Sequence, residues 1–265
     1  MDTETKNGWS KRTKAIHAGS RRSGYGELSE AIFLTQGFVY PSAEAAEQRF
    51  ENLGEDEFIY ARYGNPTVRM FEDRMASLLE YEDASACTSG MAAVSGALTA
   101  MLKAGDHLVS SRALFGSCLY VLEDILARFG VEVTLVDGTD NAQWDAAIRP
   151  DTTLVFLESY SNPALEVVDL AHVCATAHKV GALVVVDDAM ATPVFSYAAK
   201  CGADIAVVST TKHVDGQGRM LGGLIAGSRD LIRGPIETYM KHTGGAMNPF
   251  TAWTHLKSLE TMDLR

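Results

Sequence analysis

Short apolar runs alternate with helical patterns over most of this chain, and that alternation limits the fold more than any other feature of the sequence. The runs are rich in Val and Leu and do not alternate with polar residues, which is typical of strands covered on both faces. They read "HLVSS", "VEVTLVD", "TTLVFLE" and "ALVVVDD", and helical patterns follow at 114–129, around Trp144 and at 170–179. This order predicts an α/β domain with a mostly parallel sheet and helices on both of its faces.

Two further segments refine this prediction. "DIAVVST" and "GGLIAGS" lie too close together for a helical crossover, so we expect one antiparallel strand there. Upstream, "VRMFEDRMASLLE" predicts a helix. Its apolar face consists of Val68, Phe71, Met75, Leu78 and Leu79.

The chain divides into three predicted parts. Up to about Pro41, glycines interrupt any long periodicity, which predicts an N-terminal arm over residues 1–45. A helical pattern begins near Glu44 and is broken at "YARYGNPT". We expect one large domain over 46–250, and 251–265 read as the start of a helix that leads away from it.

Polar side chains follow the apolar runs, which is where an open α/β sheet holds its ligands. Asp187 ends "ALVVVD", and a carboxylate there is costly to desolvate unless a cation or a donor meets it. Lys212 follows another apolar run, and the hydroxyls of Ser209 and Thr211 lie beside it in the sequence. Asp187 alone could equally be the N-cap of the next helix.

Ser89, Gly90 and Met91 open a further helical pattern. Free N–H groups at a helix start, with a glycine that allows close approach, form an anion site, although a simple serine N-cap has the same sequence. Pyridoxal phosphate requires an Asp for its pyridinium nitrogen, donors for its phosphate and a Lys for its aldehyde. The chain offers all three, and the combination predicts this cofactor.

Charge and composition exclude several other classes of protein. The net charge of -11 repels a nucleic-acid backbone, and no stretch approaches the roughly 20 apolar residues of a membrane span. The polar N-terminus lacks the apolar core of a signal peptide. The four cysteines are scattered without paired spacing, which is typical of reduced cysteines and predicts a cytoplasmic protein.

Two other kinds of site are disfavoured by spacing. Gly216, Gly218 and Gly222 form G-x-G-x-x-x-G rather than the dinucleotide fingerprint, and a strand rather than a helix is expected next. His172 and His178 are six residues apart on one predicted helix, so they lie on different faces, and no Cys or His cluster accompanies them. We therefore expect no metal site.

Five motifs resemble, in order and spacing, the Cys/Met-metabolism family of pyridoxal-phosphate enzymes. They are "YARYGNPT", "SGM", "ESYSNP", "VVDDAMATP" and "STTKHVDGQGRMLGG", and the resemblance covers roughly residues 17–265. It implies the type I pyridoxal-phosphate transferase fold. Within the family, "LFGS" and "TKHVDGQGRMLGG" are most similar to the sulfhydrylases that act on O-succinylhomoserine.

The resemblance also implies roles for individual residues. Lys212 would hold the cofactor aldehyde and move protons, and Asp187 would keep the pyridine nitrogen protonated. The remaining cofactor contacts that it implies are Ser89, Gly90, Met91, Ser209 and Thr211 at the phosphate, Asn162 near the ring hydroxyl, and Tyr60 and Arg62 at the phosphate of a neighbouring subunit. A homotetramer with shared active sites follows from the last two.

The implied reaction replaces the γ-substituent of an acylated homoserine with sulfide, and for the succinyl ester it gives homocysteine and succinate for methionine biosynthesis. Cysteine in place of sulfide, the acetyl ester, or a truncated cofactor domain without activity are the alternatives. Phe115 departs from the tyrosine of many relatives and can stack on the ring but cannot donate, which fits the sulfhydrylases.

Two more departures concern the site and the end of the chain. Asp188 stands where relatives usually have Asn, and this second carboxylate should raise one of the two pKa values if both are buried. The chain ends at "LKSLETMDLR", where relatives continue into a C-terminal domain that binds the substrate carboxylate. We therefore expect that domain to be missing from these 265 residues.

Overall fold

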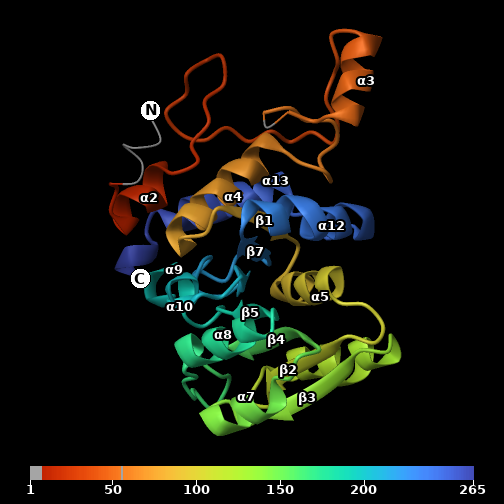
Figure 1. Ribbon diagram of the computed structural model, residues 1–265. Helices are drawn as coiled ribbons and strands as arrows, with labels where there is room; N and C mark the ends of the chain where they lie inside the picture. Colours follow the sequence, from red (N-terminus) through yellow and green to blue (C-terminus); the bar gives the residue numbers. More distant parts are fainter. Residues whose placement is uncertain (1–7, 55) are drawn as a thin grey trace.

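A seven-stranded sheet forms the centre of the protein in a computed structural model that describes residues 8–54 and 56–265 (Figure 1). The strand order is β1-β7-β6-β5-β4-β2-β3. The strands are β1 (Asp83–Cys87), β2 (His107–Ser111), β3 (Glu132–Val136), β4 (Thr152–Glu158), β5 (Leu183–Asp187), β6 (Ile205–Ser209) and β7 (Gly223–Gly227). From β6 to β3 all neighbours are parallel, and β7 runs antiparallel to both β1 and β6. The mostly parallel sheet and its late antiparallel strand are confirmed.

Helices connect and cover the strands. They are α2 (Lys11–His17), α3 (Ala43–Glu51), α4 (Pro66–Leu79), α5 (Gly90–Met101), α6 (Gly116–Tyr120), α7 (Asn141–Ala147), α8 (Leu170–Lys179), α9 (Thr192–Phe195), α10 (Ala198–Cys201), α11 (Arg229–Leu231), α12 (Glu237–Thr243) and α13 (Pro249–Leu259). Two π-helical segments, Val121–Leu126 and Ile232–Ile236, continue α6 and α11, and a 3-10 turn covers Met262–Leu264. None of the helices in the described chain combines the length and the hydrophobicity that a bilayer span needs.

The sequence explains the bounds of α4, the helix predicted from its apolar face. Asn65 accepts from the N–H of Thr67 as the N-cap, and Pro66 occupies the first turn, where its missing donor costs nothing. The helix ends at Glu80, which adopts a left-handed conformation with φ 66°. All five residues of the predicted face are buried, which confirms the periodicity.

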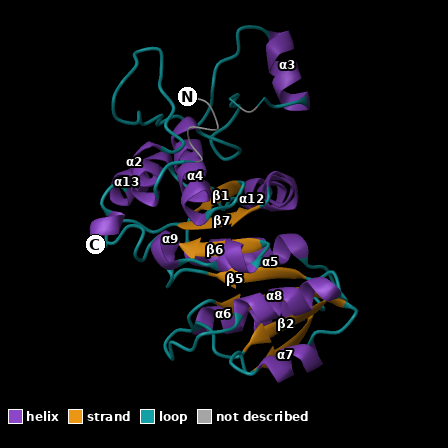
Figure 2. Ribbon diagram, turned by 60° about the vertical axis from the view of Figure 1, so that its left-hand side comes forward, coloured by secondary structure: helices purple, strands orange, loops and turns teal. Residues whose placement is uncertain are grey.

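Helices cover both faces of the sheet (Figure 2). Successive side chains on each strand point alternately to one face and the other. On β5, Val185 packs in a cluster with α5 and the segment from α6 to Leu126, whereas Val184 and Val186 pack against α7 and α8. Near β1 and β7 the second face is covered by α2, α4 and α13 instead. Two layers of helices therefore enclose the sheet, as the unalternating apolar runs predict.

Two helical segments differ from their predicted extents. The helix near Glu44 ends at Glu51, since Asn52 leaves the helical conformation, and the described residues between there and Asn65 are not helical. The helix expected over 114–129 begins only at Gly116 and changes to π-helical bonding at Val121. The division into an arm over 1–45 and a cofactor domain over 46–250 stays a prediction, and α3 crosses that boundary.

Candidate active site

Three polar side chains leave the sheet side by side at the carboxyl ends of neighbouring strands. Glu158, Asp187 and Ser209 end β4, β5 and β6, and Glu158 is the register partner of Asp187. Each lies two residues after a residue of the apolar cluster beneath α5 and α6, so period-two alternation directs all three to that face. The strand order and the pleat therefore build a polar row under one layer of helices.

The carboxylate of Asp187 belongs to a residue that is only partly exposed. One oxygen accepts the N–H of Ala189 at 3.0 Å, and the thiol of Cys118 lies 4.0 Å from the other. Desolvation, followed by the nearby charge of Glu158 and to a smaller degree Asp188, raises the pKa of Asp187 to about 7. A cation or a donor placed here would lower that pKa and complete the site.

Glu158 is buried beside Asp187 and was not among the predicted site residues. Its two oxygens accept the N–H groups of Phe115 at 2.6 Å and Asn162 at 2.8 Å. Burial raises the pKa of Glu158, and the two donors oppose that shift. The thiol of Cys118 and the carboxylates of Glu158 and Asp187 lie within 4.8 Å of one another. Burial also raises the pKa of the Cys118 thiol, which keeps it protonated and a poor nucleophile.

A candidate phosphate cradle lies at the N-terminus of α5, where the helix start meets the end of β6. Ser89 caps this helix by accepting the N–H of Ala92 at 3.1 Å. The N–H groups of Gly90 and Met91 belong to the first turn, which has no intrahelical acceptors. A Cβ added to Gly90 would lie 2.6 Å from the Cβ of Ser209 and 2.8 Å from its hydroxyl oxygen. The helix start and the end of β6 thus touch, and only glycine fits between them.

Lys212 lies in the turn after β6 with its side chain exposed. The turn is fixed on one side by Thr211, whose hydroxyl exchanges two hydrogen bonds with the backbone of Gly222. On the other side the hydroxyl of Thr210 pairs with the buried imidazole of His255 at 3.0 Å. Burial lowers the pKa of His255 to about 4, so this pair is neutral at physiological pH. The lysine therefore projects from a rigid turn.

The hairpin after Lys212 contains a local ion pair. Asp215 is fully buried and accepts the N–H of Arg219 at 2.7 Å and its Nε at 3.3 Å. Arg219 also donates to the hydroxyl of Ser258 on α13 at 2.6 Å. These contacts pair the two residues and tie the hairpin to α13.

Phe115 ends the loop after β2 as the N-cap of α6, Asn162 lies in the loop after β4, and Glu158 binds both backbones. Phe115 is 45% exposed, so part of its side chain is accessible. The side chain of Asn162 is also exposed. The structure thus brings both residues to the edge of the sheet where Asp187 lies.

Tyr60 and Arg62 lie in a different part of the chain. The guanidinium of Arg62 donates to the carbonyl of Lys241 on α12 and lies over the rings of Tyr60 and Tyr63, 5.3 and 5.0 Å from their centroids. Arg62 lines a cavity of about 530 Å³ between α4, α12 and the loop before α4. No contact found among the described residues joins either side chain to Lys212.

Asp188 points to the other face of the sheet, because successive side chains of an extended chain point to opposite faces. Its carboxylate is fully buried and accepts the hydroxyl of Ser159 at 2.7 Å. Burial raises the pKa of Asp188. The predicted coupling of the two carboxylates is present, but burial and Glu158 outweigh Asp188 in raising the pKa of Asp187.

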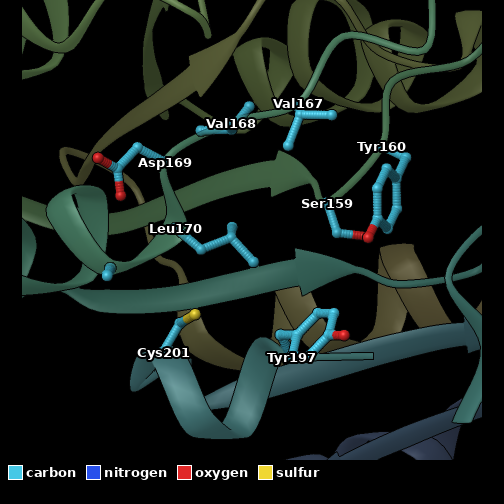
Figure 3. Close-up of a pocket in the computed structure, with 9 residues that line it drawn as sticks. Ser159, Tyr160, Val167, Val168, Asp169, Leu170, Tyr197 and Cys201 are labelled. Carbon is cyan, nitrogen blue, oxygen red and sulfur yellow. The ribbon is translucent and has the colours of Figure 1, made fainter. Parts of the chain in front are cut away.

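A second cavity of about 260 Å³ lies behind the loop after β4 (Figure 3). Its lining is mainly apolar, with Tyr197 and Cys201 on one side and Val167 and Leu170 on the other. None of the predicted cofactor residues lines this cavity. The site at the strand ends is therefore separate from it.

Comparison with known proteins decides which family this site belongs to. Residues 12–265 match the family described as "Cys/Met metabolism PLP-dependent enzyme". The chain belongs to this family. Its cofactor is accordingly pyridoxal 5'-phosphate, in agreement with the prediction from Asp187, Lys212 and the helix start.

Individual members of the Cys/Met metabolism family are similar over almost the whole chain. An O-succinylhomoserine sulfhydrylase of Mycobacterium tuberculosis is 49% identical over 97% of this chain, and an L-methionine gamma-lyase of Porphyromonas gingivalis is 39% identical over 96%. These alignments cover 63% and 64% of the two relatives, so the chain spans less than two thirds of their length.

A solved member of the same family resembles the fold described above. The structure of a putative O-acetylhomoserine (thiol)-lyase from Campylobacter jejuni matches with a TM-score of 0.91 and 26% identity, over 97% of this chain and 71% of that one. It contains a pyridoxyl-lysine phosphate residue. This agreement confirms the predicted transferase fold.

The residues present at the strand ends suit pyridoxal phosphate. At the start of α5, where a Cβ on Gly90 would collide with Ser209, backbone N–H groups and the hydroxyl of Ser209 can donate hydrogen bonds to an anion. The water-poor carboxylate of Asp187 is suited to a protonated ring nitrogen, and the amine of Lys212 is accessible. Each chemical group of the cofactor therefore has a partner in the chain.

Proposed function

We propose that this chain carries the cofactor site of an enzyme that replaces the succinyl group of O-succinylhomoserine with sulfide, giving homocysteine and succinate. One observation supports the site most directly. Lys212 extends from a turn fixed by Thr210 and Thr211, next to the cradle formed by Gly90 and Ser209, while Asp187 ends the adjacent strand. The similarity to O-succinylhomoserine sulfhydrylases supports the choice of substrate.

The proposed roles follow from the chemistry of each residue. When bound, pyridoxal phosphate supplies an electron-accepting ring that stabilises negative charge on substrate carbons. Lys212 holds the aldehyde and carries protons to and from those carbons, and Asp187 retains the proton on the ring nitrogen. Phe115 stacks on the ring, and the amide of Asn162 hydrogen-bonds the ring hydroxyl.

The phosphate is bound at the start of α5. The N–H groups of Gly90 and Met91 donate to it, and the positive end of the helix dipole favours its charge. Ser209 donates its hydroxyl. Ser89 and Thr211 act through the backbone, since the hydroxyl of Ser89 caps α5 and that of Thr211 bonds Gly222.

Phe115 favours sulfide addition over elimination in this proposal. Its ring has no hydroxyl, so a reaction that needs a phenol near the cofactor lacks that donor. Cysteine is the alternative nucleophile, and the acetyl ester is the alternative substrate. Steady-state competition between sulfide and cysteine on the succinyl ester separates homocysteine formation from cystathionine formation.

We also propose a homotetramer in which Tyr60 and Arg62 complete the phosphate site of a neighbouring copy. Within the described chain, Arg62 lines the large cavity rather than the Lys212 site. Mixing Arg62→Ala subunits with Lys212→Ala subunits tests this, because hybrid oligomers regain complete sites only if the sites are shared between subunits. A cytoplasmic location is proposed as well, in line with four free cysteines.

Reduction and mass mapping test the cofactor site. The chain is loaded with pyridoxal phosphate, reduced with borohydride, digested, and its peptides are weighed, with Lys212→Ala and the control Lys179→Ala treated alike. We expect the adduct on Lys212 in the wild type and the control, and none in Lys212→Ala. Modification elsewhere, or substantial succinate release by Lys212→Ala, would refute the assignment. An adduct on Lys212 without any turnover would identify a cofactor domain that is inactive by itself.

A further inference from the structure

Glu158 connects two loops that the proposed function assigns to the cofactor ring. It ends β4, and the residue is only 4% exposed. One oxygen accepts the N–H of Phe115, which lies 43 residues earlier in the chain, and the other accepts the N–H of Asn162. A single side chain therefore fixes the loop after β2 and the loop after β4 to each other.

A buried carboxylate needs a reason to remain at such a position. Leaving a charge in a water-poor site costs several kcal/mol unless donors compensate it. Here the two donors are main-chain N–H groups at 2.6 and 2.8 Å, which are short, charge-assisted hydrogen bonds. Neither oxygen takes part in an ion pair found in the described chain. The hydrogen bonds of this carboxylate therefore go to the backbones of the two loops.

The neighbourhood of Glu158 connects this geometry to Asp187. The two residues are register partners on adjacent parallel strands and face the same helices. Their carboxylate oxygens and the thiol of Cys118 lie within 4.8 Å of one another. Phe115, Asn162 and Asp187 are the groups proposed for the ring face, the ring hydroxyl and the ring nitrogen, so Glu158 lies at the junction of all three.

We propose that Glu158 is a positioning residue that holds Phe115 and Asn162 at the spacing the cofactor ring requires relative to Asp187. It does not touch the ring itself. Its loss releases both loops, so only a fraction of molecules has Phe115 and Asn162 in the positions that bind the cofactor at any moment. Apparent affinity falls in proportion to that fraction. This inference rests on the proposed cofactor site.

Two variants separate the geometry from the charge. Glu158→Gln keeps the length of the side chain but turns an NH₂ group toward one of the two N–H donors, so one hydrogen bond is lost. Glu158→Asp keeps the charge and both acceptors but is one methylene too short to reach both loops. Glu132→Gln is the control, because Glu132 is exposed at the opposite end of the sheet.

Two properties of the bound cofactor are measured for each variant: its dissociation constant by absorbance titration, and the circular dichroism of its visible band, which reports ring orientation. For Glu158→Gln and Glu158→Asp we expect about 10- to 100-fold weaker binding and a diminished visible band. The adduct still forms on Lys212. The control should match the wild type in both. Unchanged affinity and visible dichroism in either folded variant would overturn the proposal.

Hydrogen exchange in the wild-type chain tests the same idea without a substitution. In the cofactor-free protein the amide protons of Phe115 and Asn162 should be protected, whereas the neighbouring Gly116 and Ala164 should exchange quickly. Fast exchange of both Phe115 and Asn162 would show that Glu158 does not hold them, even if the variants fail to fold. Failure of the cofactor site itself would appear differently, as a wild-type chain with no adduct on Lys212.

Discussion

Gly90→Ala offers a sharp test of the phosphate cradle, because the added atom meets a fixed partner. Its Cβ would lie 2.6 Å from the Cβ and 3.1 Å from the Cα of Ser209. Ordinary carbon contacts are about 3.5–4.0 Å, so α5 and the end of β6 must separate by roughly 1 Å. No flexible side chain can absorb this shift, since the backbone of Ser209 is involved. Overpacking of this kind costs about 1–3 kcal/mol of stability.

The same separation weakens cofactor binding. If the hydroxyl of Ser209 loses its contact with the phosphate, one charge-assisted hydrogen bond worth about 1.5–3 kcal/mol is lost, which is roughly 10- to 100-fold in affinity. Absorbance titration of the cofactor-free protein measures this, and thermal melting should show a decrease of several degrees. Gly24→Ala is the control, because nothing lies within 4 Å of its added Cβ. A Gly90→Ala protein that binds the cofactor within about twofold of the wild type would refute the cradle.

Two other substitutions test the electrostatics. The pKa of Asp187 is about 7 in the folded protein and about 4 in unfolded chains. The cofactor-free protein should therefore lose stability as the pH rises from about 4 to about 7, and Asp187→Asn should lose less over that range. The same pH dependence of the urea-denaturation midpoint in both proteins would contradict this. Arg233 donates to the buried carboxylate of Asp83 at 2.6 and 2.9 Å, and Arg69 donates to the same carboxylate at 2.8 Å. Because Arg69 still pairs Asp83, Arg233→Met should lower the free energy of unfolding by about 1.5–3 kcal/mol, the contribution of a hydrogen bond to a charged group. Arg128→Met, at an exposed pair with an N–O distance of 3.9 Å, should change it by less than about 1 kcal/mol, and equal effects in urea denaturation would be the contrary result.

Much of this site could be predicted because parallel strands deliver their carboxyl ends to one edge. An apolar run that ends in Asp187, and another that precedes Lys212, place both residues there without any knowledge of strand order. The helix start at Ser89 follows from the same logic. The sequence did not predict which strands are neighbours in the sheet. The position of β1 beside β7, rather than beside β2, depends on packing across the whole domain.

Glu158 shows where the prediction stopped short. It ends "TTLVFLE" just as Asp187 ends "ALVVVD", so the same signal was available for it. Its partners are backbone N–H groups of Phe115 and Asn162, which carry no side-chain signature and cannot be read from residue types. The opposite orientations of Asp187 and Asp188 do follow from the period of two, because the chain is still hydrogen-bonded to β6 at Asp188, one residue beyond β5.

The antiparallel position of β7 makes the phosphate cradle depend on parts of the chain that are far apart in sequence. β1 pairs only with β7 in the sheet, and the paired residues Cys87 and Gly223 lie about 140 residues apart in the chain. During synthesis, Ser89 and Gly90 emerge long before Ser209 and the strand that anchors them. In the finished sheet β7 lies between β1 and β6, and α5 packs against both β6 and β7. The phosphate cradle therefore depends on contacts between segments that are far apart in the chain.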